Sequence, residues 1–62
     1  MKNKNFTSLN KAFTYFDMIK LNFVAFLIHN REEDIYEVIN QDLYDHYTEE
    51  FDLDMELIEL SC

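Results

Sequence analysis

Apolar residues recur at steps of three and four along the first half of the chain. The series comprises Leu9, Ala12, Phe13, Phe16, Ile19, Phe23, Phe26 and Leu27. This spacing is typical of one face of an α-helix. Ser8, directly before the series, is a residue that can cap the first turn of a helix through its hydroxyl group. The pattern predicts a helix over residues 8–28.

The later part of this predicted helix is apolar on a second side as well. The second set comprises Met18, Leu21, Ala25 and Ile28. A helix with two apolar sides must be covered twice, and a chain this short can supply only one cover. We therefore predict that these four residues form an oligomer interface and that the protein is a homodimer.

The segment 29–34, HNREED, interrupts the pattern and predicts the start of a second helix. Asn30 is a favourable N-cap residue, and Glu33 stands where the acid of a capping box reaches back to it. Acids in a first turn also interact favourably with the helix dipole. Apolar positions then return every four residues, at Ile35, Ile39, Leu43 and Tyr47. We predict a helix over 31–49, antiparallel to the first.

The carboxyl-terminal segment permits two interpretations. As a strand it would alternate at Leu53, Met55 and Leu57, but Ile58 breaks that alternation. We favour a short helix near 52–60, because Leu, Met and Glu are good helix formers and β-branched residues are scarce. The chain also has no glycine or proline, whereas tight hairpins favour glycine. The predicted fold is all-α; the alternative is α+β, with strands near 21–28 and 53–60.

The length of 62 residues predicts one domain, 1–62, with a polar and mobile segment at 1–7. A domain near this size buries only about 60% of the surface of its unfolded chain, so disulfides, metals or oligomerisation usually supplement its core. The single cysteine, Cys62, excludes an internal disulfide and suits a reducing, cytoplasmic location. The longest apolar stretch, 21–28, is too short to span a bilayer, so we expect no membrane partner.

Charge divides the chain into two unlike halves. Residues 1–31 carry five basic residues and Asp17, a net charge of +4, whereas residues 32–62 carry twelve acids and no Lys or Arg, a net charge of −12. Such asymmetry suggests an electrostatic partner. A helical segment 32–59 would present one acid per roughly 3.5 Å, close to the phosphate spacing of about 3.4 Å along a nucleic-acid strand.

We therefore hypothesise a small non-enzymatic inhibitor, of the anti-defence type, that imitates nucleic-acid charge. Its partner would be the basic surface of a nucleic-acid-binding protein. The residues predicted to bind that partner are Asp34, Glu37, Asp42, Tyr44, Asp45, Glu49, Asp52, Asp54, Glu56 and Glu59. The alternative is a small dimeric regulatory or antitoxin-like interaction protein whose acids only keep it in solution.

The sequence gives little support for metal binding, catalysis or direct nucleic-acid binding. The segment DLDME resembles the start of a calcium loop, but Leu57 occupies the position that requires glycine. Asp42, His46 and either Glu49 or Glu50 have helical spacing that could hold a metal, yet such spacing arises readily by chance in an acidic chain. No catalytic motif is present, and the acidic half would repel nucleic-acid phosphates. We expect no metal, no cofactor, no enzymatic activity and no direct nucleic-acid binding.

Overall fold

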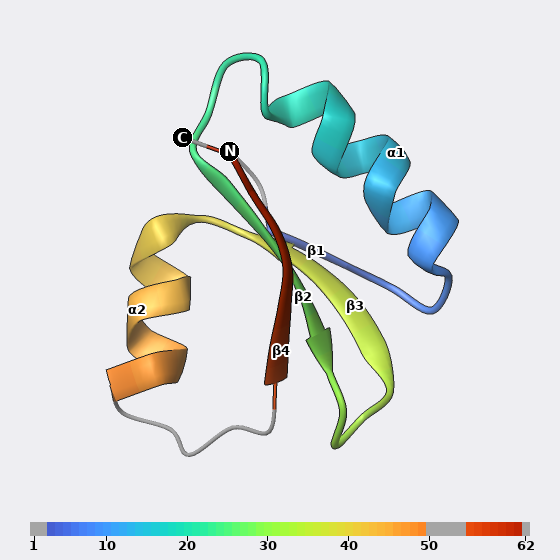
Figure 1. Ribbon diagram of the computed structural model, residues 1–62, viewed down its shortest axis with the longest axis vertical. Helices are drawn as coiled ribbons and strands as arrows, with labels where there is room; N and C mark the ends of the chain where they lie inside the picture. Colours follow the sequence, from blue (N-terminus) through green and yellow to red (C-terminus); the bar gives the residue numbers. More distant parts are fainter. Residues whose placement is uncertain (1–2, 50–54, 62) are drawn as a thin grey trace.

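The computed structural model, which describes residues 3–49 and 55–61, is an α+β fold. Its elements are β1 (Lys4–Phe6), α1 (Leu9–Ile19), β2 (Ala25–Asn30), β3 (Ile35–Ile39), α2 (Gln41–Glu49) and β4 (Met55–Ser61) (Figure 1). The strands form one antiparallel sheet. The predicted all-α fold is therefore wrong, and the α+β alternative is confirmed at the level of fold class. Lys4–Phe6, which we expected in a mobile segment, form strand β1.

The order of strands in the sheet is β1-β3-β2-β4. Because every neighbouring pair is antiparallel, β1 and β2 run in the same direction with β3 between them, and β3 and β4 do so with β2 between them. The chain is thus two overlapping split β-α-β units. The connection from β1 to β2 and the one from β3 to β4 both cross the sheet toward β4. They start from β1 and β3, which run in opposite directions. Connections of the same hand then place their helices on opposite faces.

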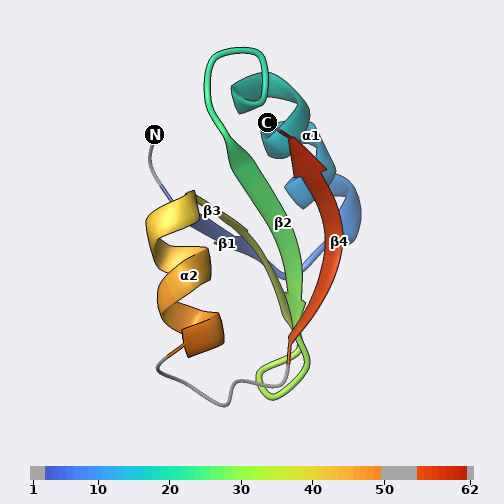
Figure 2. The same ribbon diagram turned by 60° about the vertical axis from the view of Figure 1, so that its left-hand side comes forward.

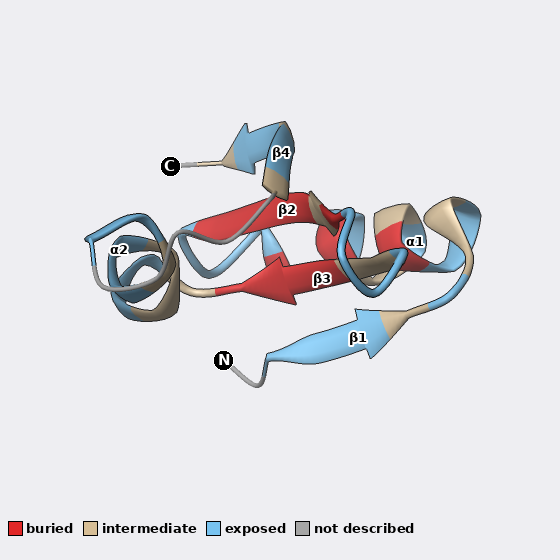
Figure 3. Cartoon of the chain, turned by 90° about the horizontal axis from the view of Figure 1, so that it is seen from below, coloured by how far each residue is buried: buried red, intermediate tan, exposed pale blue. Residues whose placement is uncertain are grey.

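The two helices do cover opposite faces of the sheet (Figures 1 and 3). One buried cluster lies between α1 and the sheet and includes Phe16 of the helix and Leu27 and Val38 of the strands. The face under α2 holds a smaller buried cluster of Phe26, Ile28 and Ile39. The central strands β2 and β3 carry most of the buried positions of the sheet, whereas the edge strands β1 and β4 are largely exposed (Figure 3).

The predicted first helix, 8–28, is wrong beyond Ile19. Ser8 does stand at the N-cap, although its side chain makes no capping hydrogen bond within the described part of the chain. Residues 25–30 form β2, in which Ala25 and Leu27 face α1 while Phe26 and Ile28 face α2. The two apolar sides that suggested a doubly covered helix are the two faces of a central strand. A strand buried on both faces is expected to be a nearly continuous apolar run.

The predicted helix 31–49 is wrong in its first half. The Asn30 Oδ1 atom accepts hydrogen bonds from the amides of Glu32 (3.1 Å) and Glu33 (3.4 Å), as an N-cap would. The chain then turns back instead of continuing as a helix, and Asp34 adopts the left-handed conformation with φ 54° before β3 begins. Asparagine makes the same local bonds in a turn as at a helix start. Only the second half of the prediction is helical, as α2.

The predicted helix near 52–60 is also wrong, because Met55–Ser61 form β4 at the edge of the sheet beside β2 (Figure 2). Leu27 pairs with Glu59 and Ile28 with Leu57, so Ile58 is the extra residue of a β-bulge. The bulge turns Ile58 toward the α1 cluster and leaves Leu57 and Leu60 on the α2 face. This irregularity explains the broken alternation in the sequence.

Candidate functional site

The acids predicted to form one binding array are distributed over both sides of the sheet. Asp42, Asp45 and Glu49 are exposed on α2. Glu56 and Glu59 are exposed on β4, and their register with His29 and Leu27 places them on the α1 face. Asp52 and Asp54 lie outside the described residues. The described acids therefore do not form one continuous line. The spacing argument for 32–59 fails because the described residues of that segment form a turn, a strand, a helix and a second strand.

Two of these acids contact side chains of the same chain, Asp34 through a hydrogen bond and Glu56 through an ion pair. The Asp34 carboxylate lies 3.0 Å from the Nε2 atom of His29. The Glu56 carboxylate lies 3.7 Å from the guanidinium group of Arg31. Both acids remain well exposed, so these pairs lie at the surface, where such contacts contribute little stability. The contact with Arg31 places the charge of Glu56 next to a basic group of the same chain.

Glu37 has a structural role that the sequence analysis missed. It is only 5% exposed, on the α2 face of β3. Its carboxylate accepts a hydrogen bond from the Asn30 side-chain amide (3.4 Å) and another from the Tyr47 hydroxyl group (3.2 Å). Burial, followed by the charge of Glu37, raises the pKa of Tyr47 above its ordinary value. This network links β2, β3 and α2 and removes Glu37 from the surface.

Tyr44, which we predicted to bind the partner, packs against the sheet. Its ring stacks on that of Phe26 with the centroids 4.2 Å apart and the planes 6° from parallel. This contact and those of Leu43 and Tyr47 attach α2 to the sheet. Tyr44 therefore contributes to the fold with one face of its ring.

The residues predicted to form the oligomer interface fall into two groups. Ala25 and Ile28 are fully buried in the sheet, whereas Met18 and Leu21 are exposed. The structure adds four more exposed large apolar residues among those it describes, namely Phe23, Val24, Leu57 and Leu60. A helical pattern could not show that Leu57 and Leu60 lie on the same face of a strand. A strand with a bulge at Ile58 does place both leucines on one face.

Leu57 and Leu60 continue the buried apolar surface of the sheet to its open edge. Leu57 pairs with the buried Ile28, and Leu60 pairs with the buried Phe26. Both leucines remain exposed, by 43% and 47% respectively. We call the outer side of β4, with these two leucines, the β4 edge. Within the described residues β4 pairs on one side alone, with β2, so this edge combines unpaired backbone groups with apolar side chains. Such a surface is typical for pairing with another strand.

Residues 3–49 and 55–61 contain neither a cluster of metal-ligating side chains nor a membrane-spanning helix. No three side chains of His, Cys, Asp or Glu come together there in a way that could hold a metal ion. Neither α1 nor α2 has the length and apolarity that crossing a bilayer requires. No family model, curated protein or solved structure matches this chain.

Proposed function

We propose that this chain is a small non-enzymatic interaction protein of the regulatory, antitoxin-like type, and that it acts as a homodimer paired through the β4 edge. The observation that carries the proposal is the exposure of Leu57 and Leu60 on an open edge strand, next to buried core residues. The single cysteine fits a reducing compartment, and we place the dimer in the cytoplasm.

A twofold axis perpendicular to the sheet would pair the two β4 strands antiparallel. Side chains directly opposite each other in such a pair lie on the same face. With Leu57 opposite Leu60 of the second copy, four leucines meet on the α2 face. Glu56 then stands opposite Ser61, and Glu59 opposite Ile58, so that no carboxylate directly faces another. This isologous contact closes the assembly at two subunits.

Burying the four leucines of the dimer would add significant stability to a domain with a small core. Fully burying a leucine contributes about 1.5–3 kcal/mol, and these leucines are already about half-buried, so each would add about 1 kcal/mol. Pairing would also satisfy backbone groups along β4. Small domains often obtain the stability that their core lacks in this way.

The acids have a simpler role under this proposal, which is to keep a dimer with exposed apolar residues in solution. Charge imitation of nucleic acid is supported less well, because Glu37 is buried and the other described acids face different directions. Reversing the charge of Asp45 and Glu49 on α2 should therefore leave dimer formation intact.

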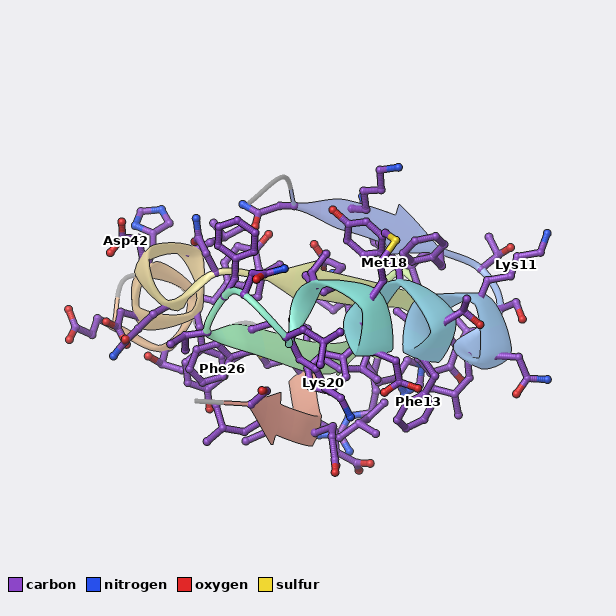
Figure 4. All side chains as sticks on the ribbon, turned by 90° about the horizontal axis from the view of Figure 1, so that it is seen from above. Lys11, Phe13, Met18, Lys20, Phe26 and Asp42 are labelled. Carbon is purple, nitrogen blue, oxygen red and sulfur yellow. The ribbon has the colours of Figure 1, made fainter. Side chains whose placement is uncertain are left out.

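The test replaces the two leucines of the β4 edge. We expect sedimentation equilibrium to give a dimer of about 15 kDa, twice the 7.6 kDa chain, and the Leu57→Glu/Leu60→Glu variant to sediment as a folded monomer. Met18→Glu is the matched control, because Met18 is also exposed but lies on the β1 side of α1 (Figure 4). A wild-type monomer, or a double variant that dimerises like Met18→Glu, would contradict the proposal.

A cross-linking measurement tests the pairing register without relying on disruptive substitutions. Directly opposite residues of antiparallel strands have Cα atoms about 4.5–5.5 Å apart, within the range of a disulfide. Leu57→Cys/Leu60→Cys, in a Cys62→Ser background, should form interchain disulfides on mild oxidation. Three residues along one strand span roughly 10 Å, which prevents an intrachain bond. Met18→Cys in the same background should stay largely monomeric on a non-reducing gel.

A further inference from the structure

The opposite edge of the sheet carries a hollow between β1 and α1. Its volume is about 360 Å³, and it is lined by Lys4, Phe6, Lys11, Thr14, Tyr15 and Met18. A volume of this size falls within the range of ligand-binding hollows in proteins, about 300–1,000 Å³. Two of the chain's five basic residues line it, and none of these six lining residues is acidic, although the chain has a net charge of −8. We call this feature the β1–α1 groove.

The wall and floor of the groove are apolar and partly aromatic. Lys4 and Phe6 pair with Val38 and Tyr36, which places both side chains on the α1 face. The rings of Phe6 and Tyr15 have centroids 5.7 Å apart, and the Lys4 ammonium group lies 5.1 Å from the centre of the Tyr15 ring. Met18, 60% exposed, extends along the β1 side of α1 (Figure 4). An apolar side chain in the groove would contact these groups.

β1 adds an open backbone edge to the groove. Within the described part of the chain β1 pairs on one side alone, with β3. A peptide laid along such an edge hydrogen-bonds to its backbone, and its alternate side chains enter the pockets beside it. The open edge and the apolar groove lie on the same side of the molecule, so one extended ligand can use both.

We propose that the β1–α1 groove binds an extended acidic segment of a partner protein, added as a strand to β1. One apolar side chain of the segment occupies the groove, and carboxylates on either side of it face Lys4 and Lys11. The net charge of the protein is negative, but charges beyond a Debye length of about 8 Å are largely screened at physiological salt. The two nearby lysines therefore dominate at the groove. This site goes beyond the proposed function, because pairing through β4 leaves β1 free.

The probe is an end-blocked, fluorescein-labelled peptide, glutamate–threonine–phenylalanine–threonine–glutamate. In a strand, both glutamates and the phenylalanine of this peptide point to one face. We expect fluorescence anisotropy to show saturable binding that weakens several-fold between about 0.05 and 0.5 M NaCl. The peptide with alanine in place of phenylalanine, and the one with lysines in place of glutamates, should each bind about tenfold more weakly or not at all.

Matched lysine variants then locate the site. Lys4→Glu/Lys11→Glu should bind the peptide about tenfold more weakly, because two attractions become repulsions. Lys20→Glu should bind within about twofold of wild type. Lys20 is an exposed lysine next to α1 that pairs with Asp17 and lies away from β1 (Figure 4). In the wild type, NMR amide shifts should change at Lys4–Phe6 and spare β4.

Peptide binding in the β1–α1 groove and dimerisation through the β4 edge can be tested independently. Leu57→Glu/Leu60→Glu should bind the peptide as well as wild type, so the groove can be tested whether or not the protein dimerises. Equal binding by the Lys4→Glu/Lys11→Glu and Lys20→Glu variants, or amide shifts on β4 instead of β1, would overturn the groove proposal. So would loss of self-association in Lys4→Glu/Lys11→Glu, because the groove would then be occupied by a second copy.

Discussion

At the scale of single residues, the role of an acid depends on the face of the element that carries it. Glu37 lies in the acidic half of the chain, yet it is buried, with hydrogen bonds from Asn30 and Tyr47. A buried carboxylate is costly unless donors surround it, so these two partners are a condition for its position. Its neighbour Val38 has the opposite orientation because side chains alternate along a strand.

Tyr47 provides a prediction at this scale. Burial and the charge of Glu37 raise the pKa of Tyr47 above 10.0, so the folded protein keeps this proton at a pH where the unfolded chain loses it. The resulting stability is fully present below pH 10 and is lost as the pH rises through the pKa of the folded state. The melting temperature should therefore fall more steeply above pH 10 in wild type than in Tyr47→Phe.

The phenolate absorbance of the same proteins gives an independent measurement. The folded wild type should show a late step from Tyr47, which should disappear in Tyr47→Phe but remain in Tyr44→Phe. Near neutral pH, loss of the hydrogen bond to Glu37 should cost Tyr47→Phe about 1 kcal/mol of unfolding free energy. Identical alkaline curves for Tyr47→Phe and wild type would show that the network does not form.

At the scale of elements, the same four-residue spacing of apolar residues occurs in both a strand and a helix. Ile35 and Ile39 share a face of β3, while Leu43 and Tyr47 share a face of α2. Residues four apart return to the same side in a strand as well as in a helix. The four-residue series therefore indicated correctly that Ile39, Leu43 and Tyr47 pack together, and it could not indicate where the strand ends and the helix begins.

The true start of α2 is at Asn40. Its Oδ1 atom accepts a hydrogen bond from the amide of Leu43 (2.9 Å), and its carbonyl oxygen accepts one from the amide of Tyr44 (3.0 Å). Its own amide donates to the Asn3 side chain, 37 residues away (2.9 Å). Asn30 makes the same kind of local bond but pairs with Met55 and Ile35 in the sheet. Contacts with other elements distinguish the two asparagines.

Asn40→Ala should remove this cap and lower the free energy of unfolding by about 1 kcal/mol, as other helix caps do. Chemical denaturation measures the loss, and hydrogen exchange at the Leu43 amide should accelerate. Asn10→Ala is the control, because Asn10 is exposed within α1 and alanine is the better helix former. A stable Asn40→Ala variant, with exchange at Leu43 unchanged, would show that the cap contributes nothing.

At the scale of the whole molecule, the fold is compact but thinly covered. Its Cα radius of gyration is 10.6 Å, the value of about 10.6 Å expected for a compact chain of this length. One helix of 11 residues and one of nine cover a four-stranded sheet. A nine-residue helix is only about 14 Å long, and within the described residues β1 and β4 each pair on one side alone. The two surfaces proposed for binding, the β4 edge and the β1–α1 groove, lie at these edges.

Salt should separate an apolar dimer from a complex held by charge. Each subunit carries a net charge of −8, so association through the β4 edge works against repulsion that salt screens. Raising NaCl from about 0.05 to 0.5 M should strengthen dimerisation several-fold in sedimentation equilibrium. Asp45→Lys/Glu49→Lys should also dimerise at least as well as wild type. Dissociation of the dimer at high salt would indicate that ion pairs, not leucines, hold it.

The sequence by itself determined which residues are apolar, where the chain first enters a helix near Ser8, and that the chain breaks around the turn at 31–34. These features depend on bonds between residues a few positions apart, as helix hydrogen bonds and turns do. It also determined the number of acids and lysines, but not the faces on which they lie. Only the tertiary structure decided that 25–30, 35–39 and 55–61 are strands, because β3 also pairs with β1, and β2 with β4, far along the sequence. The strand register and the bulge at Ile58 then placed Glu37 in the core and Leu57 and Leu60 at an open edge, where no local pattern could place them.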